Sequence, residues 1–246
     1  MRNTMLDPAG PNEKTAIEVH VDCARSLVEL TAVVNSACAR VESAPETAAL
    51  VLGLVGAPAD RETWPGPVTI QEVNRWERAV RRLERLTAVN IAVASGTCGG
   101  PALDLLLAAD FRIATPDLVL VLPRNEGRFW PGMSVYRLVQ HLGLPRARRM
   151  VLSGAEVPVA LQKELGLIDE ECLDTGVAVR DMILMLDVGS GQELAIRRQL
   201  LLEAASADYD EALGAHLAAC DRELRLLRTG GETASAADLT ASAARS

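Results

Sequence analysis

The feature that most constrains the fold is a strand–turn–helix unit in the middle of the chain. Residues 89–94 form an apolar run of the length expected for a buried strand. The run leads into a glycine-rich turn, Gly96-Thr97-Cys98-Gly99-Gly100, and Pro101 follows it. Proline suits the first turn of a helix because its missing N–H has no partner there, so we predict a helix over residues 101–109. Backbone N–H groups at such a helix start suit an anion or a developing oxyanion.

The rest of the chain alternates short apolar runs with amphipathic segments, which is the pattern of an α/β fold. Asp22 is placed to cap a first helix, whose apolar stripe runs from Leu27 to Val41 at spacings of three and four. Further helices are expected at residues 70–86, 134–142, 145–152 and 158–165, and further strands at 16–21, 48–55, 111–114, 118–122 and 167–173. Loops are expected at residues 56–68 and 123–132, and a helical pattern at residues 177–228.

The helix predicted over residues 70–86 has two unlike faces. Its inward face carries Val73, Trp76, Val80 and Leu83, whereas the other face carries five arginines, at positions 75, 78, 81, 82 and 85. Pairs four residues apart, such as Glu77 with Arg81, are common on exposed helix surfaces. We therefore interpret the arginine face as a solvated surface.

Composition excludes several classes of protein. The net charge of −8 and the small number of aromatic residues give no general attraction to nucleic acid. No apolar run approaches the roughly 18 residues of a membrane span, and residues 1–14 are too polar for a signal peptide, so a cytoplasmic protein is expected. The five cysteines are scattered and odd in number, which predicts reduced thiols. The three histidines lie far apart in the sequence, so no dedicated metal site is expected.

The glycine-rich turn is compatible with more than one chemistry. It does not supply G-x-G-x-x-G, so a dinucleotide site is set aside. It does fit G-x-C-x-G, in which Cys98 would be the nucleophile of a hydrolase. That triad needs an acid and then a histidine later in the chain. His141 comes too soon for this order, and His216 lies within a helical stripe, so the competing interpretation of Cys98 is a small packed turn residue.

Residues 91–114, IAVASGTCGGPALDLLLAADFRIA, resemble the central signature of the crotonase (enoyl-CoA hydratase/isomerase) superfamily. The closing A-x-D-x-R-I-A of that signature matches residues 108–114. Further motifs follow in the family's order, namely Trp130-Pro131-Gly132, Arg137-Leu138, ARRMVLSG at 147–154 and Gly166-Leu167-Ile168-Asp169. The resemblance covers about residues 48–172.

The resemblance implies a ββα spiral core followed by a C-terminal helical region that trimerises. The implied organisation is a disordered start at residues 1–14, a core at 15–176, a helical region at 177–228 and a disordered tail at 229–246. It also implies a CoA thioester as substrate, with no separate cofactor and no metal. In the family two backbone N–H groups hold the thioester oxygen, and two carboxylates manage water and the α-proton.

The chain departs from the family at each of these positions. Pro101 falls at one oxygen-binding position and cannot donate, so Gly100 or Gly99 would donate from a turn shifted by one residue, and Gly100 is the expected substitute. At the other position Pro65 occurs, and Gly66 is the expected substitute. The first glutamate of the family is replaced by Asp104, and the second by Arg124, two residues before Glu126. The expected catalytic residues are therefore Asp104 and Glu126, and the expected oxygen-binding residues are Gly66 and Gly100.

Residues 76–116 and 129–143 resemble a narrower branch of the superfamily. Members of this branch accompany a type III polyketide synthase that makes 3,5-dihydroxyphenylacetyl-CoA, a precursor of dihydroxyphenylglycine in glycopeptide antibiotics. The resemblance implies a protein that assists dehydration and aromatisation of a polyketide-type acyl-CoA. It implies a homotrimer or hexamer, or a mixed assembly with a related hydratase or the synthase. The alternative is a non-catalytic subunit that stabilises or activates such a partner.

Overall fold

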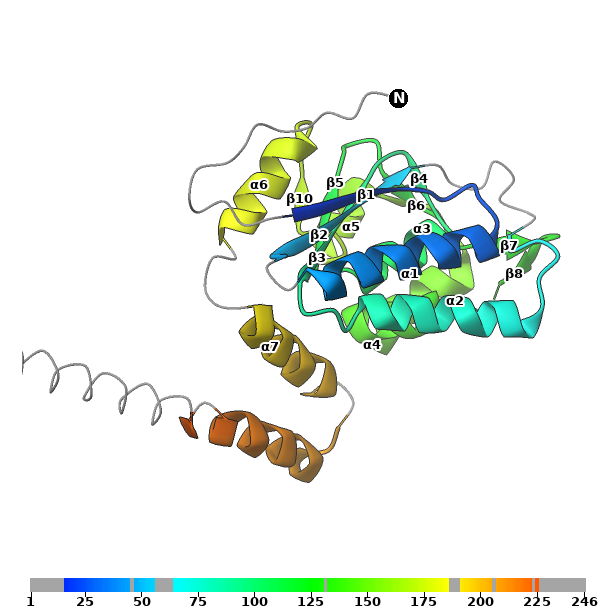
Figure 1. The fold of residues 1–246 in the computed structure, drawn as a ribbon. Coiled ribbons are helices and arrows are strands. Elements are labelled where there is room, and N and C mark those ends of the chain that lie inside the picture. The colour runs from blue at the N-terminus through cyan, green and yellow to red at the C-terminus, as the bar shows by residue number, and fades with distance from the viewer. Residues whose placement is uncertain are drawn as a thin grey trace, which may run out of the picture. The chain divides into compact units, whose positions relative to one another are not determined.

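The computed structural model describes residues 16–44, 47–55, 64–130, 132–185, 191–204, 207–222 and 224–225. The chain forms two compact units, which divide between Ala195 and Ile196. The segments predicted to be disordered, residues 1–14 and 229–246, lie outside the described residues. Figure 1 shows the sheet and its covering helices in the first unit.

The first unit is built on a five-stranded sheet in which every pair of neighbouring strands is parallel. Its order is β1 (Ala16–Asp22), β2 (Ala49–Val55), β3 (Val89–Ala94), β5 (Phe111–Ala114) and β10 (Glu170–Glu171). A parallel sheet covered on both faces needs apolar residues on both sides, which explains why β2 and β3 are nearly continuous apolar runs. The strand predicted over residues 167–173 is reduced to the two residues of β10.

Helices cover both faces of this sheet. The larger core cluster joins one face to α1 (Leu27–Ser43), α2 (Ile70–Leu83) and α3 (Pro101–Ala108), with Trp76 and Leu30 among its fully buried side chains. The smaller cluster joins the other face to α6 (Thr175–Met185) through Ala178, Val179 and Met182. The α/β architecture predicted from the alternating pattern is therefore confirmed.

The starts of the first two helices are fixed by capping boxes. The side-chain hydroxyl of Ser26 accepts from the amide of Glu29, whose carboxylate accepts from the amide of Ser26. Thr69 and Glu72 repeat the arrangement at α2. The prediction that Asp22 caps the first helix is wrong, because Asp22 ends β1 and the chain needs four more residues to turn.

The arginine face of α2 is not a uniformly solvated surface. Arg82 makes two charged hydrogen bonds to the carboxylate of Glu42 on α1, and its Nη1 also donates to Asn35 Oδ1 at 3.1 Å. The predicted pair of Glu77 and Arg81 does not form. Instead, Arg81 Nη1 donates to Glu84 Oε2 at 2.8 Å, which leaves Glu77 for another partner.

The central unit forms as predicted. Strand β3 runs into a two-residue strand, β4 (Thr97–Cys98), and then into α3, all eight residues of which are buried. Strand β4 belongs to a second, three-stranded sheet with β6 (Val119–Leu120) and β9 (Val157–Pro158). The glycine turn therefore connects the two sheets and delivers the first turn of α3 into the core.

The segments after β6 differ from the prediction in detail. Residues 123–132, expected to be a loop, contain a hairpin of β7 (Arg124–Asn125) and β8 (Arg128–Phe129). The two helices expected on either side of residue 143 form α4 (Ser134–Ser153), which is kinked at Gly143 with φ of 70°. Then follow α5 (Val159–Glu164), α6, α7 (Gly191–Ala204) and a helix over residues 209–222. None of the described helices is long and apolar enough to cross a membrane.

Candidate active site

Asp104 lies in the interior of the first unit, on the first turn of α3. Its side chain is buried, Oδ2 accepts a 3.0 Å hydrogen bond from Trp76 Nε1, and Oδ1 has no hydrogen-bond partner among the described residues. Burial, reinforced by the negative charge of Glu77, raises the pKa of Asp104 to about 7, although Arg137 and the Trp76 indole act in the opposite direction. A carboxyl with this pKa is present in both protonation states at neutral pH, which suits proton transfer.

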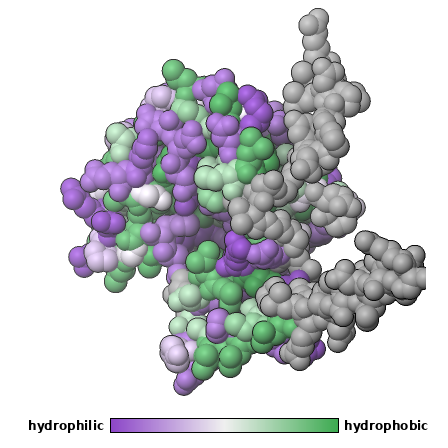
Figure 2. Space-filling model, turned by 90° about the vertical axis from the view of Figure 1, so that its left-hand side faces the viewer, coloured by the Kyte–Doolittle hydropathy of each residue, from purple (hydrophilic) through white to green (hydrophobic). Residues whose placement is uncertain are grey.

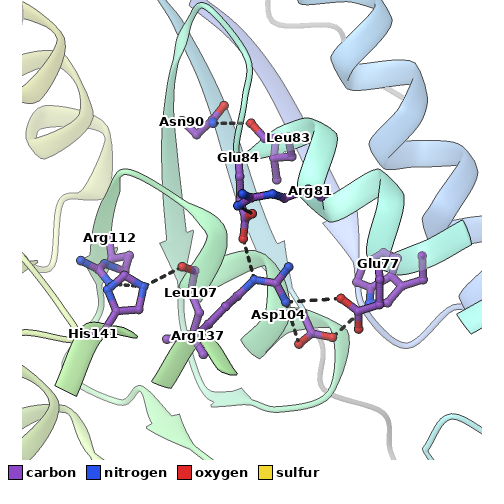
Figure 3. A network of polar contacts seen from close by, with 11 residues as sticks. Glu77, Arg81, Leu83, Glu84, Asn90, Asp104, Leu107, Arg112, Arg137 and His141 are labelled. Carbon is purple, nitrogen blue, oxygen red and sulfur yellow. Dashed lines mark hydrogen bonds and ion pairs between the residues drawn. The ribbon is translucent and has the colours of Figure 1, made fainter. Parts of the chain in front are cut away.

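Arg137 connects Asp104 to two glutamates, as Figure 3 shows. Its guanidinium comes from α4 and lies 2.7 Å (Nε) from Glu84 Oε1, 3.5 Å (Nη1) from Glu77 Oε2 and 3.8 Å (Nη1) from Asp104 Oδ1. The Arg137 side chain is only 7% exposed. Burial also raises the pKa of Glu77. Three acids therefore share one buried guanidinium, and we call these four residues the acidic cluster.

A pocket of about 760 Å³ opens beside the acidic cluster, between α2 and α4. It is lined by Glu77, Glu84 and Arg137 of the cluster together with Ile70, Gln71, Val73, Asn74, Arg78, Arg81, Met133 and Tyr136. Sequence reasoning missed this site because it assigned Glu77 to the solvated face of the helix. The one available signal was Arg137, which belongs to a matched motif although no role was assigned to it.

The glycine turn and the loop before α2 lie against each other. Gly100 has φ of 54°, and the Trp64 ring lies 3.2–3.3 Å from the position that a Cβ on Gly100 would occupy. Gly66, with φ of 73°, is two residues from Trp64. Neither the Gly66 nor the Gly100 amide donates to a backbone acceptor among the described residues. Two predicted oxygen-binding residues therefore lie on neighbouring segments, with Trp64 packed against one of them.

Glu126 is placed differently from the other predicted site residues. It lies at the tip of the β7–β8 hairpin with φ of 50°, and its side chain is exposed. The side chain of Arg124, on the same hairpin, points toward Gly154, where its Nη2 lies 2.7 Å from a position that a Cβ would take. Glu126 is thus outside the acidic cluster that surrounds Asp104.

Cys98 is inaccessible. It is 1% exposed, and desolvation raises the pKa of its thiol well above the ordinary value, so the thiolate required of a nucleophile does not form. His141 is engaged elsewhere, since its Nε2 lies 2.8 Å from the Leu107 carbonyl oxygen and its ring contacts Arg112. The structure therefore rejects the cysteine-hydrolase hypothesis and supports the packed-turn interpretation.

Polar residues of the matched motifs hold strand ends in place. Asp110 Oδ2 accepts from the Asn90 amide at 2.8 Å, and Asp169 Oδ2 accepts from the Arg112 amide at 2.8 Å. These bonds tie β5 to β3 on one side and to β10 on the other. The described residues contain no group of three potential ligands that could hold a metal ion.

The fold places the chain in the class of crotonase-like α/β proteins. A solved enoyl-CoA hydratase from Mycobacterium smegmatis superposes with a TM-score of 0.74 at 18% identity, covering 85% of this chain and 88% of that one. An enoyl-CoA hydratase/isomerase from Marinobacter aquaeolei gives a TM-score of 0.72 at 15% identity, covering 90% of each chain.

Sequence similarity identifies the family. A protein named enoyl-CoA-hydratase from Amycolatopsis orientalis is 45% identical over 200 residues, which are 81% of this chain and 89% of that protein. No protein-family model matches the sequence. On the strength of the Amycolatopsis relative, the chain belongs to the enoyl-CoA hydratase/isomerase family.

Proposed function

We propose that the chain is a hydratase- or dehydratase-type lyase that acts on an acyl-CoA thioester, with Asp104 as its proton-transferring group. The observation that carries this proposal is the state of Asp104, a buried carboxyl whose Oδ1 accepts no hydrogen bond among the described residues and whose pKa is raised to about 7. General acid–base catalysis works best when the pKa of the group lies near the working pH. The name of the Amycolatopsis relative supports the same reaction class.

The thioester oxygen would be held by the amides of Gly66 and Gly100. Donors aimed at the charge that develops on this oxygen each lower the barrier by about 3 kcal/mol. Neither amide donates to a backbone acceptor among the described residues, which supports this assignment. Pro101 has no N–H and cannot take part. In this mechanism the thioester is the substrate, and no other cofactor or metal is required.

The finer proposal is a polyketide-type substrate. The resemblance of residues 76–116 and 129–143 to the dihydroxyphenylglycine branch supports a role in dehydration and aromatisation toward 3,5-dihydroxyphenylacetyl-CoA. Removal of water that creates an aromatic ring is strongly favourable, and the proposal asks only for acid–base help from a single carboxyl. Glu126, exposed on its hairpin, would contribute only after the hairpin moves.

We also propose that the helices after residue 177 mediate assembly. Figure 2 shows hydrophobic side chains gathered on helices of the second unit. They include Leu201, Leu202, Tyr209, Leu213, Leu217 and Leu224, all exposed. Large exposed apolar patches commonly mark protein interfaces. The proposed assembly is a homotrimer or hexamer, or a mixed complex with a related hydratase or a type III polyketide synthase.

The test is turnover of a panel of enoyl-CoA and 3-hydroxyacyl-CoA thioesters by the protein and by Asp104→Asn. Loss of the only proton-transferring group should lower kcat by about 10²- to 10⁴-fold. Asp181→Asn, which changes an exposed aspartate on α6, is the matched control and should keep full activity. Equal activity of Asp104→Asn and the unchanged protein would contradict the assignment.

A second candidate, the non-catalytic subunit, is favoured by three particular observations. Pro101 removes one oxygen-binding donor, Arg124 replaces a carboxylate, and Trp64 packs on Gly100. This candidate predicts no turnover of any thioester on the panel. It also predicts that aromatic product formation by a type III polyketide synthase rises equally with the unchanged protein and with Asp104→Asn.

A further inference from the structure

The pocket between α2 and α4 has a mouth and a floor of different chemistry. Ile70, Met133 and Tyr136 at the mouth are 74%, 43% and 49% exposed. The floor carries Arg137 and Glu77, whose side chains are only 7% and 21% exposed. A ligand that fills this pocket therefore buries apolar atoms at the mouth and brings its far end to a carboxylate and a guanidinium.

The floor of the pocket lies next to the proposed catalytic carboxyl. The amide of Asp104 bonds the Gly100 carbonyl oxygen at 3.1 Å, so the carboxyl is one helical turn from the proposed oxygen-binding turn. Arg137 Nη1 lies 3.8 Å from Asp104 Oδ1 and 3.5 Å from Glu77 Oε2. Figure 3 shows Asp104 and Glu77 approaching the same side of the guanidinium.

The two glutamates of the floor differ in how fully they are engaged. Glu84 receives close bonds from both Arg137, at 2.7 Å, and Arg81, at 2.8 Å. Glu77 receives one long contact from Arg137, at 3.5 Å, and a bond from the Met133 backbone. Glu77 therefore has lone pairs left for a ligand, whereas Glu84 has few.

We infer that this pocket holds the acyl group of the thioester, and that Glu77 selects acyl groups carrying a hydroxyl oxygen. This inference rests on the proposed function. A hydroxyl donates to the Glu77 carboxylate and accepts from Arg137, so both desolvated charges gain a partner. A hydrocarbon group of the same shape removes water from Glu77 and Arg137 but forms no hydrogen bond with either. Because buried polar groups left unpaired weaken binding, the site should reject such an analogue.

The experiment compares binding of 3-hydroxyphenylacetyl-CoA and phenylacetyl-CoA by calorimetry. The two thioesters differ by one hydroxyl, and neither has a β-hydroxyl to lose, so binding is measured without turnover. A hydrogen bond to a charged group is expected to make the hydroxylated thioester bind about 10- to 100-fold tighter. Equal affinity for the two thioesters, or no binding of either, would overturn the inference.

Two methionine substitutions in the pocket test whether Glu77 is the residue that gives the preference for the hydroxylated thioester. Glu77→Met should abolish the preference while leaving the affinity for phenylacetyl-CoA within about twofold, since the methylene packing is kept. Gln71→Met, which places the same side chain elsewhere on the pocket wall, should keep the preference. A preference that survives in Glu77→Met would refute the role of Glu77.

A near-isosteric variant covers the case in which Glu77→Met does not fold. Glu77→Gln keeps an acceptor but removes the charge, and hydrogen bonds to ionised groups are about twice as strong as neutral ones. The preference should therefore fall several-fold and remain above unity. Selective binding without turnover of the enoyl-CoA panel would refute the proposed function alone, whereas turnover without selectivity would refute this inference alone.

Discussion

Replacement of Asp104 by asparagine should change how the stability of the protein depends on pH. The pKa of this carboxyl is raised from 3.8 to about 7 in the folded chain, mainly by burial. Because the folded state holds the proton more tightly than the unfolded state, this residue contributes stability at low pH, which is lost as the pH rises toward 7. Between about pH 5 and about pH 8 the loss amounts to about 2–3 kcal/mol. Asparagine cannot titrate, so the variant should lack this part of the decline.

The assay is urea denaturation at fixed protein concentration in steps from about pH 5 to about pH 8, followed by tryptophan fluorescence. The quantity of interest is the difference between the two proteins, in which titrating groups outside the acidic cluster, such as His141, largely cancel. Asp181→Asn serves as the control and should follow the unchanged protein. Parallel pH profiles for Asp104→Asn and the unchanged protein would refute the view that Asp104 is the proton-holding group of the acidic cluster.

Two further predictions concern the glycine-rich turn. Iodoacetamide should modify Cys172 and Cys220, the two partly exposed cysteines of the folded protein. It should leave Cys98 unmodified, because that thiol is buried and protonated. Peptide mass mapping before and after denaturation measures which cysteines are modified. Gly99→Ala should destabilise the fold by about 1–3 kcal/mol, because its Cβ would lie 2.5 Å from Val121 Cγ2 and 3.0 Å from the Val121 carbonyl oxygen. Gly214→Ala, where nothing lies within 4 Å, should cost no stability in the same urea titration, and an equal loss in both variants would contradict the steric argument.

Local pattern was sufficient for the main elements of the first unit. The apolar runs predicted as strands over residues 48–55 and 89–94 became β2 (Ala49–Val55) and β3 (Val89–Ala94), because a strand buried on both faces needs only continuous apolar residues. The helix cap was missed because Asp22 and Ser26 are both good capping residues. Which of the two residues caps the helix depends on the residue at which β1 ends, and the pairing of β1 with β2 determines that residue.

The candidate site was only partly predictable. Asp104 and Gly100 followed as predictions from the motif at residues 91–114, and Gly66 from the separate loop at residues 64–68. Glu77 did not, because its partner Arg137 is 60 residues away and lies on another helix. A glutamate four residues before Arg81 has the spacing of a surface pair, and nothing local shows that Arg81 turns to Glu84 instead. Long-range ion pairs of this kind are set by packing of helices rather than by the sequence around either residue.

The charge count of the acidic cluster explains why one carboxyl keeps its proton. Glu77, Glu84 and Asp104 bring three negative charges if fully ionised, and Arg137 brings one positive charge into the same interior. Arg81 reaches only Glu84, from a position that is 46% exposed, so its charge is largely screened by water. A buried excess of negative charge is costly, and uptake of a proton removes it. The proton goes where desolvation is greatest, which is Asp104, the carboxyl one turn from the proposed oxygen-binding turn. The replacement of the family's second glutamate by Arg124 therefore leaves this protonated carboxyl in place, and the proposed acid catalysis requires such a group near neutral pH.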